Sequence, residues 1–87
     1  MNAEEITAKA QAIKEATDKI IDNIPDTWYP GFGAVNWADV RCDNVYWLPA
    51  SDEYLVKVNG ANSALLAAYL RDALYRQSYE TEVITGW

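Results

Sequence analysis

Few side chains in this 87-residue chain could do chemistry, and the most informative feature is an absence. The sequence contains no histidine and one cysteine, Cys42. Without a histidine, neither a Ser–His or Cys–His dyad nor a histidine zinc site can form. A single cysteine excludes a thiolate cluster and an intramolecular disulfide. We therefore expect Cys42 to be a small buried apolar side chain and not a nucleophile.

Carboxylates are the other reactive groups, and two pairs are close in the sequence. Asp52 and Glu53 are adjacent, whereas Glu80 and Glu82 share one face of an expected strand, about 7 Å apart. Glycosidases use two carboxylates at a similar separation, but they need deep clefts that a domain of this size rarely encloses. The calcium-loop pattern of alternating acidic residues is also missing. We therefore predict a protein that is not an enzyme and holds no cofactor or metal.

The composition predicts a single folded domain over residues 1–87. Hydrophobic residues make up 51% of the chain and aromatic residues 13%, which is too apolar for a disordered protein. The net charge of −6 opposes non-specific binding to nucleic acid and to anionic membranes. The N-terminus is amphipathic instead of apolar, and no stretch is long enough to span a membrane, so we expect a cytoplasmic location.

The pattern predicts a first helix over residues 3–24. Asn2 and Glu5 resemble a capping box at its start, and Pro25 ends it. Its apolar stripe recurs at helical spacing: Ile6, Ala10, Ile13, Thr17, Ile20 and Ile24. Because polar residues occupy the d positions of the isoleucine heptad, we expect a helix laid on a sheet and not a coiled coil.

A β-hairpin is predicted next, with strands at residues 45–48 and 54–58. Alternation in the second strand places Tyr54, Val56 and Val58 on one side. The polar loop 49–52 joins the two strands. An equal alternative begins the first strand near residue 40, and residues 34–40 have the character of a short edge strand.

A second helix is predicted over residues 63–77, capped by Asn62 or Ser63, and a last strand over residues 80–85. In that strand Thr81 and Val83 share one face. The element order is therefore α-β-β-α-β. It predicts an α+β fold with a small, mainly antiparallel sheet and both helices packed on one face.

Acidity and aromatic content together favour a binding protein. Carboxylates would contact a basic protein surface, and exposed aromatic rings would supply short-range binding energy. The candidate partner-binding residues are Asp39, Asp43, Asp52, Glu53, Glu80, Glu82, Trp28 and Trp47. A second row of carboxylates lies at the end of the first helix: Asp18, Asp22 and Asp26. The alternative for each carboxylate is a solvated surface charge.

In size, acidity, aromatic content and lack of an enzyme motif, the chain resembles the small acidic phage-encoded inhibitors of the anti-CRISPR type. The resemblance implies that the protein binds a CRISPR effector complex in the host cytoplasm and blocks target DNA binding or nuclease recruitment. It is one of overall character, so no functional residue is carried over. Three alternatives stay open: a homodimeric or larger homo-oligomeric interaction module, an immunity- or antitoxin-type protein, and a small enzyme subunit.

Overall fold

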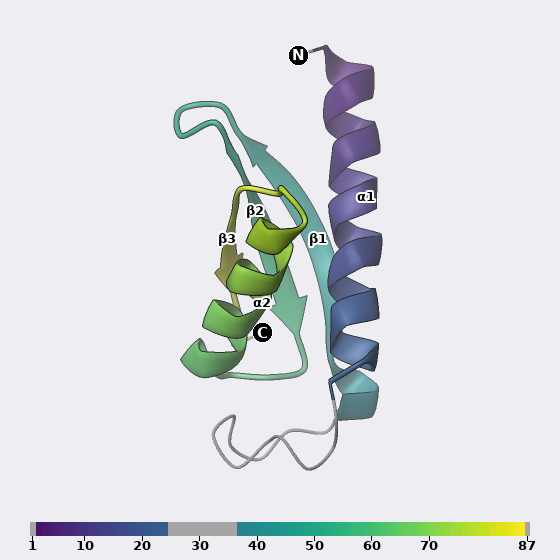
Figure 1. Ribbon diagram of the computed structural model, residues 1–87, viewed down its shortest axis with the longest axis vertical. Helices are drawn as coiled ribbons and strands as arrows, with labels where there is room; N and C mark the ends of the chain where they lie inside the picture. Colours follow the sequence, from purple (N-terminus) through teal and green to yellow (C-terminus); the bar gives the residue numbers. More distant parts are fainter. Residues whose placement is uncertain (1, 25–36, 87) are drawn as a thin grey trace.

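The computed structural model of the protein describes residues 2–24 and 37–86. In chain order, its elements are α1 (Ala3–Asp22), the 3-10 turn η3 (Trp37–Asp39), β1 (Arg41–Leu48), β2 (Glu53–Asn59), α2 (Ala64–Arg76) and β3 (Thr81–Ile84) (Figure 1). This arrangement confirms the predicted α-β-β-α-β order and the α+β class. The longer alternative for the first strand is also confirmed. The short edge strand predicted over 34–40 falls partly outside the described residues, and its described part contains η3.

The sheet is mixed, which corrects the prediction of a mainly antiparallel sheet. Its strand order is β1-β2-β3, with β1 antiparallel to β2 and β2 parallel to β3. The parallel pair arises because α2 carries the chain back along the sheet before β3 begins. The hairpin and the helical crossover therefore place β2 in the centre and leave β1 and β3 as the two edges.

Both helices pack on the same face of the sheet, as predicted. On β2, Tyr54, Val56 and Val58 are buried while the alternate residues are partly exposed. In Figure 1, α2 covers the sheet from the front and α1 lies along β1. The fully buried helical side chains facing this layer include Ile13 of α1 and Leu66, Leu70 and Leu74 of α2. The core is therefore one layer between two helices and one side of the sheet.

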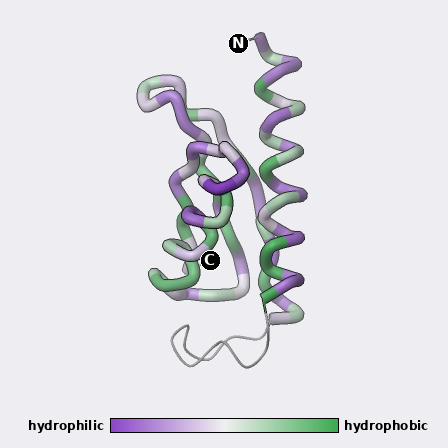
Figure 2. Tube along the Cα trace, in the orientation of Figure 1, coloured by the Kyte–Doolittle hydropathy of each residue, from purple (hydrophilic) through white to green (hydrophobic). Residues whose placement is uncertain are grey.

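The start of α1 follows the predicted pattern, and its inner stripe does so in part. Ile21, which was not predicted for the stripe, is buried, whereas the predicted Ile20 is only partly buried. The Oδ1 atom of Asn2 accepts the Glu5 N–H at 2.9 Å, and the Asn2 amide donates to Glu5 Oε1 at 3.4 Å. The hydroxyl of Thr17 is buried and donates to the Ile13 carbonyl at 2.8 Å. Figure 2 shows hydrophobic and hydrophilic residues alternating along α1, as an amphipathic surface helix requires.

Both ends of α2 carry specific caps. Ser63, and not Asn62, is the N-cap, because its Oγ accepts the Leu66 N–H at 3.2 Å. At the other end, the Tyr79 N–H donates to the Leu74 carbonyl at 3.0 Å and the Ser78 N–H to the Tyr75 carbonyl at 2.9 Å. These two bonds form a Schellman motif, in which Ser78 adopts a left-handed conformation with φ of 70°.

Hydrogen bonds fasten the end of β3 to the start of α2. The Thr85 hydroxyl accepts the Ser63 N–H and donates to the Ser63 carbonyl, each at 3.1 Å, and the Gly86 N–H donates to the Ala61 carbonyl at 2.7 Å. The loop before α2 also packs closely, because a Cβ at Gly60 would lie 2.3 Å from the Asp39 carbonyl oxygen. The start of the crossover is therefore held against the residues that follow β3.

We expect Ile13→Asp to lower the free energy of unfolding by at least about 3 kcal/mol, because it places an unpaired charge in the core. Ile13 is fully buried. The matched control is Ala8→Asp, which adds the same charge at an exposed position of α1. Urea unfolding monitored by circular dichroism measures both. Equal losses in the two variants would show that this stripe is not the core.

We expect Ser78→Gly to raise the free energy of unfolding by roughly 0.5–1 kcal/mol, because glycine removes the Cβ strain of the left-handed cap. Ser78→Ala keeps the Cβ and is the control, for which no gain is expected. Thermal and urea unfolding measure the difference. A gain of the same size in both variants would rule out relief of backbone strain as the cause.

Candidate protein-binding surface

The candidate site is the face of the sheet that no described helix covers, called here the open face. Cross-strand pairing sets Tyr46 opposite Leu55 and Leu48 opposite Glu53, while Glu82 lies opposite Leu55 on the other side. The alternate residues of each strand point into the core instead. The open face therefore consists of Arg41, Asp43, Asn44, Tyr46, Leu48, Glu53, Leu55, Lys57, Asn59, Glu82 and Ile84.

The centre of the open face is apolar. Tyr46 and Leu55 are cross-strand neighbours about 4.8 Å apart along the hydrogen-bonding direction, and they form this apolar centre. Glu82 follows Leu55 in the same row, on the edge strand β3. Tyr46 is 44% exposed, although it lies in the middle of a strand. A tyrosine ring combines an apolar body with a polar hydroxyl, and such residues often dominate the binding energy of protein interfaces.

Carboxylates surround this apolar centre. Asp43 Oδ2 lies 3.7 Å from Lys57 Nζ, so the lysine on the open face already has an acidic neighbour. Glu53 and Glu82 add two further negative charges. Glu80 directly precedes β3, and its carbonyl accepts the Tyr54 N–H at 3.1 Å, which places it next to the Glu53 end of β2. The structure therefore brings together three of the six predicted sheet carboxylates, Glu53, Glu80 and Glu82. Asp43 lies on the same face of the sheet but beside Lys57, toward the other end of β2.

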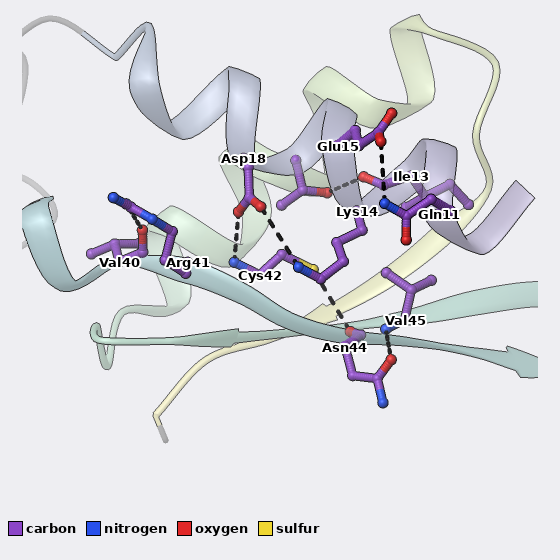
Figure 3. A network of polar contacts seen from close by, with 11 residues as sticks. Gln11, Ile13, Lys14, Glu15, Asp18, Val40, Arg41, Cys42, Asn44 and Val45 are labelled. Carbon is purple, nitrogen blue, oxygen red and sulfur yellow. Dashed lines mark hydrogen bonds and ion pairs between the residues drawn. The ribbon is translucent and has the colours of Figure 1, made fainter.

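A polar network between α1 and β1 supports one side of the open face (Figure 3). Asp18 Oδ1 accepts the Cys42 N–H at 2.8 Å, and Asn44 Oδ1 accepts the Val45 N–H at 2.8 Å. Between these two bonds, β1 contains a bulge. The bulge turns the exposed Asp43 and Asn44 outward opposite Lys57.

The same network changes the interpretation of the second acidic row. Asp18 is a structural residue, because its Oδ1 accepts the Cys42 N–H of β1 and its Oδ2 lies 4.0 Å from Lys14 Nζ. Asp22 is exposed near the end of α1, and Asp26 lies outside the described residues. The described part of this row therefore contains one anchoring carboxylate and one exposed carboxylate, which do not form a separate binding surface.

The other predicted partner-binding residues are dispersed. Asp39 is exposed in η3, before β1, whereas Asp52 occupies the hairpin turn after β1 with a positive φ of 53°. Trp47 is half-buried against the core, and its ring centroid lies 4.8 Å from that of Tyr54. Trp28 lies outside the described residues. The structure therefore assigns Trp47 to the edge of the core, which leaves Tyr46 as the aromatic residue of the open face.

The three exposed large hydrophobic residues of the described chain were not among the predicted partner-binding residues. They are Tyr46, Leu65 at 52% exposure and Tyr75 at 67% exposure. The signal for Tyr46 was alternation, because neighbouring Val45 and Trp47 face the core and leave Tyr46 outward. Tyr75 similarly follows the buried Leu74 on α2 and lies off the inner leucine stripe.

Cys42 has the environment of an inert core residue. Its side chain is buried, and burial, with a smaller contribution from the Asp18 carboxylate, raises the pKa of the thiol to about 11. A thiol with this pKa stays protonated at neutral pH and is a poor nucleophile. The prediction that Cys42 is a buried apolar residue is therefore confirmed.

Comparisons with protein-family models, curated proteins and solved structures found no match for the chain. Residues 2–24 and 37–86 contain no helix that is long and apolar enough to cross a membrane. They also contain no group of three or more cysteine and carboxylate side chains arranged to hold a metal ion.

We expect the stability that Cys42 contributes to decrease as the pH rises from about 9 to 11. Above pH 9 the unfolded chain releases the thiol proton while the folded chain keeps it, so ionisation favours unfolding by up to roughly 2–3 kcal/mol. Cys42→Ala removes this dependence. Urea unfolding at pH 7 and pH 10.5 should therefore show the stability advantage of the wild type shrinking at high pH, with partner binding at pH 7 unchanged. Parallel pH curves would contradict the pKa assignment.

Proposed function

We propose that the protein is a small acidic binding protein without enzymatic activity that inhibits a nucleic-acid-handling complex. The specific proposal is an anti-CRISPR protein that blocks target DNA binding or nuclease recruitment. The supporting observation is the open face, where Asp43, Glu53 and Glu82 surround the exposed Tyr46 and the central Leu55. A basic surface that normally binds phosphate groups is complementary to such a face.

The two kinds of residue on the open face would act at different distances. The net charge of −6 attracts a basic surface over several ångströms and raises the rate of association. The ring of Tyr46 and the side chain of Leu55 act only after contact, when they exclude water and slow dissociation. In this mechanism the carboxylates occupy positions that phosphates would take on the partner.

The size of the open face limits how it can bind. Three strands about 4.8 Å apart and four to eight residues long present roughly 300 Å². A stable protein interface buries about 800 Å² on each partner. The contact must therefore extend beyond the open face onto neighbouring surface, and the nearest acidic surface is the β3 side of the sheet, where Glu80 is exposed.

The homo-oligomer alternative has less support from this geometry. Two copies joined through their open faces would bring Glu53, Glu82 and Asp43 of each copy close to the same residues of the other. Against these three carboxylates, the described part of this face holds two cations, Arg41 and Lys57, and Lys57 already lies beside Asp43. Like charges in such an interface oppose association.

We expect Glu53→Lys combined with Glu82→Lys to reduce the association rate with the partner by an order of magnitude or more, because the steering charge is reversed. Affinity capture from host lysate with quantitative mass spectrometry identifies the partner, and surface plasmon resonance then measures the rates at several salt concentrations. Tyr46→Ala should mainly accelerate dissociation.

The matched control is Glu4→Lys combined with Glu15→Lys, which makes the same change in net charge at exposed positions of α1. It should leave most of the association rate intact, and circular dichroism must show all variants folded. An affinity that does not vary with salt, or an equal loss in both double variants, would overturn binding through the open face. Capture of a complex that does not handle nucleic acid would overturn the proposed inhibitory function.

A further inference from the structure

The outer edge of β3 is the feature that the open face does not explain. β3 is the last strand of the sheet, and no described element pairs with its other side (Figure 1). The Tyr54 N–H donates to the Glu80 carbonyl, so Glu80, Glu82 and Ile84 direct their backbone groups to β2 in the alternation of a parallel ladder. The backbone groups of Thr81 and Val83 therefore point to the free edge.

We propose that this edge binds an extended segment of a partner protein as an added β-strand, and that the segment carries basic residues at alternate positions. Strand addition uses backbone hydrogen bonds for affinity and alternate side chains for specificity. The inference rests on the proposed function, since it names the form in which a basic partner would reach this protein. Strand addition at this edge would extend the binding surface beyond the limited area of the open face.

The opposite edge of the sheet, formed by β1, is protected against strand addition. On β1, the Cys42 N–H already donates to Asp18 and the Val45 N–H to Asn44 Oδ1. The α1 helix also lies along this strand, and the bulge interrupts its hydrogen-bonding pattern. Natural sheets protect their edges with such devices. Within the described chain, β3 has neither a bulge nor a side chain bonded to its outward N–H groups, although the strand is short and α2 packs against its core side.

Surface hollows beside β3 leave room for an incoming strand. One hollow of about 420 Å³ includes Thr81 in its lining, and a second of about 410 Å³ includes Val83. Both hollows are also lined by Ala68 and Arg71 of α2. Thr81 and Val83 are only 4% and 6% exposed, so these hollows provide the access to their backbone groups. We call this combined surface the edge groove.

The charges along the edge groove select a basic segment. Glu80 and Glu82 are exposed and lie about 7 Å apart on the open-face side of the edge, at the spacing of alternate strand residues. Glu53 lines the same end of the groove as Glu80. The helix side of the groove is not acidic overall, because Arg71 lines both hollows and Asp72 Oδ2 is paired with Arg76 at 2.8 Å. Lysine or arginine at alternate positions of an added strand would lie beside Glu80 and Glu82, where opposite charges stabilise cross-strand pairs. Residues between them would face Ala68 and Arg71 of α2, so these residues should be uncharged.

A second copy of this chain fits the edge less well. Antiparallel addition that pairs Thr81 with Val83 of the copy would set the two Glu82 side chains directly opposite each other. Like charges at directly opposite positions destabilise a strand pair. The same carboxylates that attract a basic segment therefore disfavour self-pairing.

The test uses the full chain and the capped peptide acetyl-Lys-Thr-Lys-Thr-Lys-Thr-Lys-amide. Two-dimensional NMR should map its binding to β3, and the exchange of the Thr81 and Val83 amide hydrogens should slow at least roughly tenfold at saturation, since these amides gain partners. An analogue with glutamate in place of lysine should not bind. Ala68→Trp, which fills the edge groove from an exposed helix position, should weaken binding of the lysine peptide, and Ala8→Trp should not.

N-methylated peptides distinguish strand addition from simple charge attraction without altering the protein. In either strand direction, only alternate peptide N–H groups face β3. Methylating that set should weaken binding at least roughly tenfold, whereas methylating the other set should have a much smaller effect. Equal effects of the two sets, or unchanged exchange at Thr81 and Val83, would overturn the proposal. Slow exchange of both amides in a self-associated free protein would also overturn it, because a second copy would then occupy the edge.

The two proposals can fail separately. If the lysine peptide adds to β3 but the captured complex does not handle nucleic acid, the edge proposal stands and the inhibitory function fails. If a nucleic-acid-handling complex is captured while the Thr81 and Val83 amides stay unprotected in its presence, the function stands and the edge proposal fails.

Discussion

A core built on one side of a three-stranded sheet governs the rest of this structure. Ile13 from α1, Leu70 from α2 and Val56 from the central strand meet in a single apolar layer, and all three are fully buried. With both helices on that side, the other side of the sheet faces solvent over the described part of the chain. Small domains have a high ratio of surface to volume, which makes such one-sided cores common and leaves surface available for binding.

The attachment of α1 to β1 makes the two edges of the sheet different. Asp18 accepts a backbone N–H of β1 across the interface, so a charged residue of the helix takes the place of a neighbouring strand. A carboxylate that accepts a backbone N–H forms a stronger hydrogen bond than a neutral group does. The helical crossover gives β3 no such partner for its outward N–H groups. The hydrogen bonds between Thr85 and Ser63 fix only the residue that follows the end of β3. The fold thus protects one edge and exposes the other.

The distribution of charge determines which kind of partner the unprotected edge and the open face would attract. Glu80 and Glu82 lie along the unprotected edge, and Glu53 and Asp43 continue the acidic character over the open face around Tyr46. A basic protein surface could therefore approach the face, and a basic extended segment could approach the edge, without rearrangement of the core. Both modes of binding use side chains that contribute little to stability, since exposed carboxylates are weakly coupled to folding.

The sequence by itself determined the elements and which of their faces are buried. Periodicity placed both helices and the strands, because burial of Ile13 or Val56 needs the helical and strand spacings that the chain displays. Local hydrogen-bonding chemistry likewise predicted the Asn2 cap. Two features depended on tertiary structure. The parallel pairing of β3 follows from the path of α2, and the anchoring role of Asp18 from a bond spanning 24 residues. Each joins segments distant in the chain, and local patterns carry no information about such contacts.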